Sequence, residues 1–399
     1  MLARHAGRTS GGGAAIPRPP ASSPAPALLD EHGMVRLMAS ALVAFQDQSD
    51  RNRFGWEPLP RAFLRFIDVA AARNSLQKPS RPWPTNHTQF IRLAETPLGM
   101  WAGTWLEGPG RDFAECRLVE DGVITSECVE LALEARDPEL EWRENEGYAA
   151  LLEACGSLGE EHGDALYTEW RRFVIEHPVI ASINDVLDAV PSVTRVARWK
   201  DLVDLFYGEV PEALAFGDHV KLCTVSGTLL RRADRDGGFH AESRDPRARR
   251  AAAEGLHRTL PFHPGRTLQL RRAFRMSWCH PGLAELDLAK GLERLGWRVS
   301  LWPHRDRIDV EAEASSGRRL AVSVKTHASP ERLARVFDEA AEFGGWRATH
   351  DCFLVVPDHL CAAGSRYCER FERQRAALGL PAVRLLSVSG LLGQAGRAL

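Results

Sequence analysis

Residues 281–399 alternate helical and extended hydrophobic patterns, and this alternation constrains the fold more than any other feature of the chain. Pro281 and Gly296 bracket a helix, because proline is favoured in a first turn and glycine just past a helix end. The patterns that follow indicate three strands, a helix, a strand, a helix and a strand, at 297–302, 307–313, 319–326, 329–341, 352–356, about 358–377 and 382–388. The order αβββαβαβ predicts an α/β domain with a mixed sheet and helices on both faces.

The rest of the chain is predicted to be mostly helical. Its 399 residues allow two or three domains of about 100–200 residues each. We expect a disordered lead rich in Pro, Ala, Gly and Ser at 1–26, followed by a largely helical N-terminal region of unknown role at 27–150. A helical domain at 151–222, a basic insert at 223–272 and the α/β domain at 273–399 should complete the chain.

Several classes of protein are excluded by what the sequence lacks. No apolar run approaches the roughly 20 residues that a membrane-spanning helix needs, and the N-terminus has no apolar core of a secretory signal. The 8 cysteines are scattered, which indicates free thiols in a reducing cytoplasm. No phosphate-binding G-x-x-x-x-G-K-[ST] loop is present, so nucleotide hydrolysis is not expected.

Charge is segregated along the chain even though the net charge is only −2. Between residues 231 and 272 there are 11 arginines and 5 acids, a local net charge of +6. Such a segment fits the phosphate backbone of DNA, and Arg247, Arg249 and Arg250 are the candidate contacts. An ordinary solvated loop remains the alternative.

Three charged residues occupy informative places in the α/β pattern. Glu285 lies in the first turns of the leading helix, Asp309 at the start of the second strand and Lys325 at the end of the third. A lysine that ends an apolar strand needs a partner, since its ammonium is costly to desolvate. Carboxylates on adjacent strands suit Mg²⁺, and a nearby ammonium can stabilise charge on a reacting phosphate.

This arrangement resembles the PD-(D/E)XK nuclease superfamily, in which an Asp on the second strand precedes D/E-x-K on the third. Within that superfamily, the chain resembles one family more specifically: the restriction-endonuclease-like protein encoded beside a PIWI-like protein in pPIWI-RE islands. The similarity lies in segments 280–286, 301–313 and 320–334. One departure is Ser323, where the family has an acid. Glu311 lies two residues after Asp309, on the same face of the strand, and is the candidate to replace the missing acid as the second metal ligand. The alternative is that Glu311 simply belongs to the polar face of the strand.

The resemblance implies a Mg²⁺- or Mn²⁺-dependent DNA endonuclease of a defence system, with a PIWI-like protein and a helicase as partners. Because a hydroxyl is a poor substitute for a carboxylate, a catalytically impaired DNA-binding or scaffold subunit is the second possibility. The family's insert favours paired cysteines. Here only Cys223 remains, near His240, His257 and His263, so we expect a degenerate, metal-free zinc-ribbon-like insert.

Overall fold

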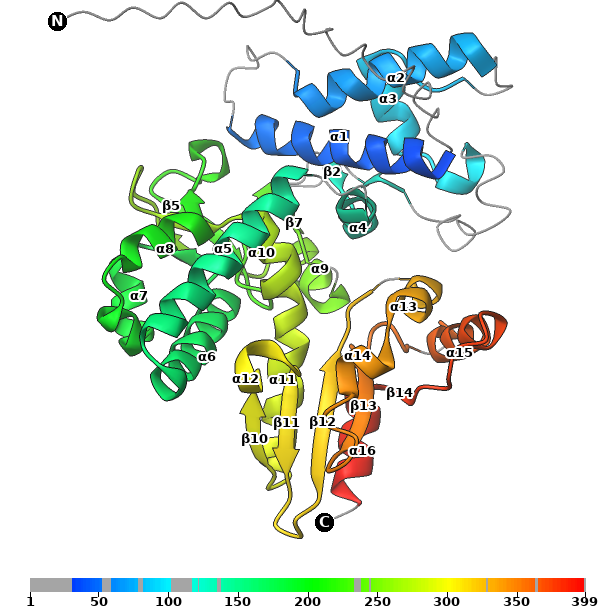
Figure 1. The fold of residues 1–399 in the computed structure, drawn as a ribbon. Coiled ribbons are helices and arrows are strands. Elements are labelled where there is room, and N and C mark those ends of the chain that lie inside the picture. The colour runs from blue at the N-terminus through cyan, green and yellow to red at the C-terminus, as the bar shows by residue number, and fades with distance from the viewer. Residues whose placement is uncertain are drawn as a thin grey trace, which may run out of the picture.

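The computed structural model describes ten segments of the chain and runs from a helical N-terminal part to a C-terminal sheet domain (Figure 1). The described residues are 31–51, 59–77, 82–101, 117–120, 122–134, 138–232, 238–243, 245–327, 329–362 and 365–397. The lead predicted at 1–26 lies outside them. Within the described segments, no helix combines the length and the apolarity needed to cross a bilayer.

The N-terminal part is a small helical unit with its own hydrophobic core. Helix α1 packs against α2 and α4, and the core includes Met34, Phe63, Phe90 and Leu131. Apart from a pair of two-residue strands, its elements are helical. They are α1 (Glu31–Arg51), α2 (Arg61–Gln77), α3 (His87–Ala94), η1 (Leu98–Met100), β1 (Val119–Glu120), β2 (Val123–Ile124) and α4 (Ser126–Glu134).

The middle part is mainly helical and also contains a three-stranded sheet that the hydrophobic patterns did not predict. Its order is β3-β9-β4, with both pairs antiparallel. These strands have two or three residues each, too short for a recognisable alternation. The elements are α5 (Pro138–Ser157), α6 (Glu160–Glu176), β3 (Val179–Ile180), α7 (Asn184–Ala189), η4 (Pro191–Arg195), α8 (Trp199–Phe206), β4 (Tyr207–Glu209), η5 (Glu212–Leu214) and β9 (Leu268–Leu270).

The basic insert folds as two short antiparallel ribbons and one helix. Strand β5 pairs with β8, and β6 pairs with β7. Helix α9 begins at Pro246, with Asp245 as its N-cap accepting a hydrogen bond from the Arg247 amide. The elements are β5 (His219–Cys223), β6 (Leu230–Arg232), β7 (Phe239–Ala241), α9 (Pro246–Ala253) and β8 (His257–Pro261).

The leading helix of the C-terminal domain begins earlier than predicted. The chain is already helical in α10 (Arg272–Phe274) and in the π-helical turn η6 (Arg275–Cys279), and it continues without a break into α11 (His280–Arg294). Pro281 therefore lies inside a continuous helical segment. The wider π turn accommodates its missing amide donor, which a regular α-helical interior does not.

The C-terminal sheet has five strands in the order β10-β11-β12-β13-β14. The first three strands are antiparallel neighbours, whereas β12, β13 and β14 run parallel, so the sheet is mixed. The strands are β10 (Arg298–Leu301), β11 (Val310–Glu313), β12 (Arg319–Val324), β13 (Asp351–Val356) and β14 (Leu385–Ser387). The helices between or after them are α12 (Pro303–Asp306), α13 (Pro330–Val336), α14 (Glu339–Phe343), α15 (Tyr367–Ala377) and α16 (Val388–Gly396).

This element order differs from the predicted αβββαβαβ in several places. A short helical turn, α12, lies between the first two strands, β10 and β11, and the helix α16 follows the last strand, β14. The helix predicted at 329–341 is two helices, because Phe337 and Asp338 adopt extended backbone angles between α13 and α14. Helix α15 begins at Tyr367, nine residues after the predicted position 358.

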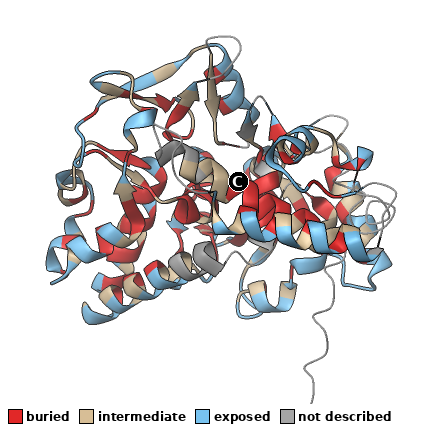
Figure 2. Cartoon of the chain, turned by 90° about the horizontal axis from the view of Figure 1, so that it is seen from above, coloured by how far each residue is buried: buried red, intermediate tan, exposed pale blue. Residues whose placement is uncertain are grey.

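Helices cover both faces of the sheet. Val310, Val322 and Phe353 belong to the core that includes α11 and α16, and their neighbours Ala321 and Leu354 belong to the core under α13 and α15. The first of these cores continues into α6 and α8 of the middle part, so the sheet domain and the middle helices share one apolar interior. Figure 2 shows helices on which buried residues alternate with exposed ones, as expected where one side of a helix faces the interior.

Candidate active site

Asp309 and Lys325 meet at one end of the C-terminal sheet. Asp309 directly precedes β11 and Lys325 directly follows β12, and these strands are antiparallel, so both residues lie at the same end. The Asp309 Oδ2 atom accepts a hydrogen bond from the Val324 amide at 2.6 Å. It lies 3.8 Å from Lys325 Nζ. The backbone thus fixes the carboxylate beside the ammonium.

Glu342 is a third member of the site, and the sequence patterns did not identify it. Its Oε1 atom accepts hydrogen bonds from Lys325 Nζ, at 2.8 Å, and from the hydroxyl of Ser323. The same hydroxyl lies 3.3 Å from Asp309 Oδ2. Glu342 reaches this position from α14, which begins at the N-cap Asp338. A carboxylate from a helix therefore occupies the region where the third strand carries a serine.

The ammonium of Lys325 is held in its charged form. Burial alone lowers the pKa of a lysine, but the carboxylates of Asp309 and Glu342 outweigh it and leave the pKa above its ordinary value. The lysine is therefore protonated at neutral pH. In this state it can stabilise negative charge on a phosphate but cannot act as a base.

Glu285 lies on the α11 side of the same strand end and is almost fully buried. Its carboxylate accepts hydrogen bonds from Arg171 Nη2, at 3.2 and 3.3 Å, and from the indole of Trp302. Burial raises the pKa of Glu285 to about 7, and the negative charge of Asp309 adds to this effect against the opposing Arg171. Glu285 can consequently change its protonation state near neutral pH.

Arg171 brings helix α6 of the middle part into the site. Its guanidinium is buried between the rings of Trp278 and Trp302, 5.2 Å from each centroid. Besides Glu285 it bonds Asp306 Oδ2 at 2.6 Å. One cation therefore compensates two carboxylates that burial would otherwise make costly.

The turn that leads into Asp309 has an unusual backbone. Four of its residues have positive φ, between 51° and 75°, in the left-handed region that residues with a side chain rarely adopt. They are Trp302, His304, Arg305 and Asp306. Helix α6 holds this turn at two points. Arg171 bonds Asp306, and Asp164 accepts a hydrogen bond from Arg305 Nε at 2.7 Å.

Comparison with protein families identifies this part of the chain. Residues 282–399 match the model of the REase (restriction endonuclease) that associates with pPIWI-RE, and residues 34–181 match domain Y of the pPIWI-RE three-gene island. The chain is a component of a pPIWI-RE island. Its C-terminal domain is restriction-endonuclease-like. No curated protein and no solved structure matches it significantly.

In this pPIWI-RE protein, the carboxylate of Glu311, the predicted second metal ligand, contacts a histidine. Glu311 pairs with Ala321 of β12, two residues further from the strand end than Ser323, and its carboxylate contacts His350 Nε2 at 3.0 Å. Glu311 is therefore engaged by the largely buried side chain of His350, and the glutamate that contacts Ser323 is Glu342. The hydrophobic pattern gave little indication that Glu342 reaches the site, because its helix is short and begins only after an unpredicted break at Asp338.

The three arginines predicted to bind DNA lie on or near the surface of α9. Arg247 is committed to two carboxylates, Asp245 at 2.6 Å and Asp287 of α11 at 3.2 Å. Arg249 donates from Nε to the Ser243 carbonyl, at 3.3 Å. Arg250 is exposed. The charge of Arg247 is thus largely neutralised within the protein, which weakens it as a phosphate contact.

The donor set of the pPIWI-RE site fits a cation that needs few protein ligands. Among the described residues, no three or more His, Cys, Asp or Glu side chains are grouped to hold a metal ion, and this includes Cys223 and its neighbouring histidines. The site offers two carboxylates, Asp309 and Glu342, linked through the Ser323 hydroxyl. Mg²⁺ is commonly held by one or two carboxylates together with water and substrate phosphates, so this set suits it.

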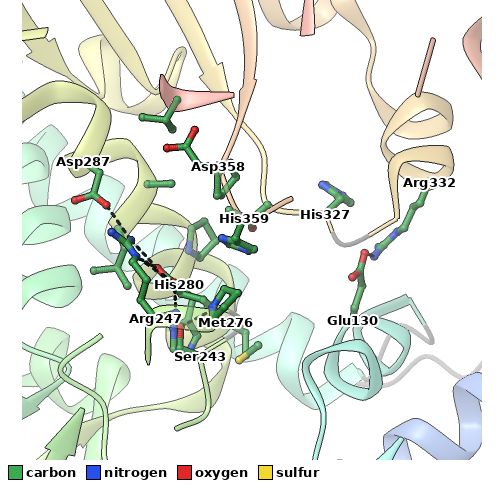
Figure 3. Close-up of a pocket in the computed structure, with 18 residues that line it drawn as sticks. Glu130, Ser243, Arg247, Met276, His280, Asp287, His327, Arg332, Asp358 and His359 are labelled. Carbon is green, nitrogen blue, oxygen red and sulfur yellow. Dashed lines mark hydrogen bonds and ion pairs between the residues drawn. The ribbon is translucent and has the colours of Figure 1, made fainter. Parts of the chain in front are cut away.

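A cavity of about 550 Å³ lies at the carboxyl ends of β12 and β13, and the described residues that line it do not include Asp309, Lys325 or Glu342. Thr326, the residue after Lys325, lines it, as do residues of α9 and the start of α11. In Figure 3, His327 and Arg332 lie on one side of it, and His280 and His359 lie on the other. Ligands bind preferentially at such strand ends, so the cavity is a second candidate binding site.

Proposed function

We propose that this chain is a divalent-metal-dependent endonuclease that hydrolyses DNA phosphodiester bonds within a pPIWI-RE defence system. The observation that carries the proposal is the pair of bonds from Lys325 and Ser323 to Glu342. They supply a carboxylate at the position where the third strand lacks one. The restriction-endonuclease-like family of the domain supports the same reaction class.

Each residue of the site has a role in this proposal. Asp309 and Glu342 would hold Mg²⁺ or Mn²⁺. When bound, such an ion polarises the phosphate and lowers the pKa of a water molecule for attack. The protonated Lys325 stabilises the negative charge that develops on the phosphate oxygens.

Glu285 supports the site from the buried side. Its pKa of about 7 lets it carry a proton or a negative charge near neutral pH, depending on the charges brought by metal and substrate. Together with Arg171 it fixes Trp302, whose amide donates to the Asp309 carbonyl at 3.0 Å. We assign Glu285 a positioning role for Asp309.

Cleavage of plasmid and single-stranded DNA by the purified chain, with Mg²⁺ or Mn²⁺, tests the proposal. Glu342→Gln removes the carboxylate charge and should lower the rate by about 100-fold, comparable with the loss of one preorganised stabilising group. Ser323→Asp in the Glu342→Gln background should restore cleavage, because it returns an acid to the strand. Glu339→Gln is the matched control, since Glu339 lies on the same helix but pairs with Arg347.

The alternative is a catalytically impaired DNA-binding or scaffold subunit of the same system. Ser323 in place of a strand carboxylate is the observation that favours it. Assays that include the PIWI-like protein and the helicase of the island distinguish the two functions. Absence of cleavage by the folded wild type and by Ser323→Asp, in the complete system, would establish the scaffold role and refute the nuclease proposal.

A further inference from the structure

The two ribbons of the basic insert carry a cluster of cations stacked on aromatic rings. We call it the cation–aromatic face and define it by Phe216, Lys221, Arg232, Phe239 and His257. The first four come from β5, from the residues just before it, and from the β6–β7 ribbon, and His257 opens β8. Strand β5 contacts β6, and Arg232 lies directly opposite Phe239 in the register of β6 and β7.

The rings hold the cations at short distances. Lys221 Nζ lies 4.3 Å from the ring centroid of Phe239 and 5.0 Å from that of Phe216. The guanidinium carbon of Arg232 lies 4.7 Å from the centroid of Phe216. The two phenylalanine rings meet edge to face at 5.7 Å, and His257 packs against Phe239 at 5.4 Å. The result is a fixed arrangement of two positive charges over two rings.

These cations keep their charge available, in contrast to Arg247. In the part of the chain that the structure describes, no ion pair joins Lys221 or Arg232 to a carboxylate, whereas Arg247 is shared by two aspartates. An aromatic ring orients a cation without neutralising it. Asp218 is an acid close to Lys221 in the sequence, and its carboxylate is bound by His219 at 3.0 Å.

The face is also accessible. Arg232 is exposed, and Phe216, Lys221 and Phe239 are half-buried. Half-exposed aromatic rings and guanidinium planes are surfaces on which unpaired bases stack, and the cations beside them can contact the phosphates between those bases. In a duplex the base faces are stacked on each other and cannot reach such a surface.

We propose that the cation–aromatic face binds single-stranded nucleic acid, through base stacking on Phe239 and Arg232 and phosphate contacts from Lys221. The binding site is separate from the cleavage site at Asp309 and Lys325. It does not require that the nuclease site be active, so the failure of either proposal leaves the other intact. Contact to this face replaces the α9 arginines as the main basis for nucleic-acid binding.

Fluorescence anisotropy of the full-length chain with a labelled 20-nucleotide oligo-dT, in EDTA to prevent cleavage, tests the proposal. Phe239→Leu should weaken binding by about 5- to 150-fold, the range for loss of one stacked base. Lys221→Gln should reduce the slope of log K against log salt by about 0.7, as expected for one lost phosphate contact to a single strand. Arg294→Gln is the control, because Arg294 is an exposed arginine in the last turn of α11, in the C-terminal domain.

Loss of the face must be separated from unfolding of the insert and from simple loss of charge. Thermal unfolding of each variant shows whether the insert is intact, and Arg232→Lys keeps the charge while it removes the planar stacking group. The proposal expects weaker binding by Arg232→Lys and tighter binding of oligo-dT or oligo-rU than of a duplex of equal length. Unchanged binding by folded Phe239→Leu and Lys221→Gln, or a larger loss in Arg247→Gln than in either, would overturn it.

Discussion

The buried guanidinium of Arg171 should be one of the most important single side chains for the stability of this protein. We consider Arg171→Met, which keeps an apolar stem between Trp278 and Trp302 but removes the charge. The side chains of Arg171 and Glu285 are only 6% and 2% exposed. Removal of one partner from such a buried pair costs about 3–5 kcal/mol, because the other charge is left uncompensated.

The loss should depend on pH in a defined direction. In the wild type the pKa of Glu285 is raised to about 7, from an ordinary value of 4.5. An acid with a raised pKa in the folded state lowers stability as the pH rises from its unfolded pKa to its folded pKa, and in the wild type this decline ends near pH 7. Without Arg171 the pKa of Glu285 rises further, so the decline continues above pH 7. The difference between the two proteins should then grow by about 1.4 kcal/mol per pH unit there.

Urea unfolding between pH 5.5 and 8, followed by tryptophan fluorescence, measures this difference. Arg198→Met is the matched control. Arg198 and Asp201 form an exposed pair with side chains 85% and 52% exposed, so the control should lose less than about 1 kcal/mol at any pH. A loss in Arg171→Met no larger than in the control, or one that does not increase between pH 7 and pH 8, would contradict this reasoning.

Two further predictions concern contacts around the site. Arg332 of α13 bonds Glu130 of α4 at 2.6 Å, and the glutamate side chain is only 3% exposed. Arg332→Met should therefore reduce the free energy of unfolding by about 3 kcal/mol in the urea assay, and Glu130→Met should reduce it by less. Asp338→Ala removes the N-cap of α14 and should reduce the free energy of unfolding by about 1 kcal/mol. Because that helix carries Glu342, the rate of DNA cleavage should also fall. Asp338→Asn keeps a capping side chain and should retain most of the rate.

The convergence of Asp309, Lys325 and Glu285 could be anticipated from the sequence. Alternating apolar residues marked β11 and β12, and a short connection between them favours an antiparallel pair, which brings the start of one strand beside the end of the next. Glu285 was identified by its place in the first turns of the predicted leading helix. These inferences rest on periodicities that act over a few residues.

Glu342 and Arg171 could not be found in the same way. Glu342 reaches the site only because the chain breaks at Phe337 and Asp338, whereas a single helix satisfies the apolar spacing from 329 to 341 equally well. Arg171 is 138 residues before Asp309 in the sequence, and its helix shows only an ordinary apolar face around it. Contacts of this range depend on how the helices and the sheet dock, which local hydrophobic patterns do not encode.

The left-handed turn before Asp309 bears on which part of the chain can work independently. Each residue with a side chain in that conformation costs about 1–2 kcal/mol, and the ion pairs from Arg171 and Asp164 offset this cost. A fragment cut to the boundaries of the nuclease-like family match, 282–399, would keep Asp309 and Lys325 but lose both restraints on the turn. The smallest unit that holds Asp309 in this geometry therefore extends back through α6, so the restriction-endonuclease-like domain does not stand alone as a transferable module.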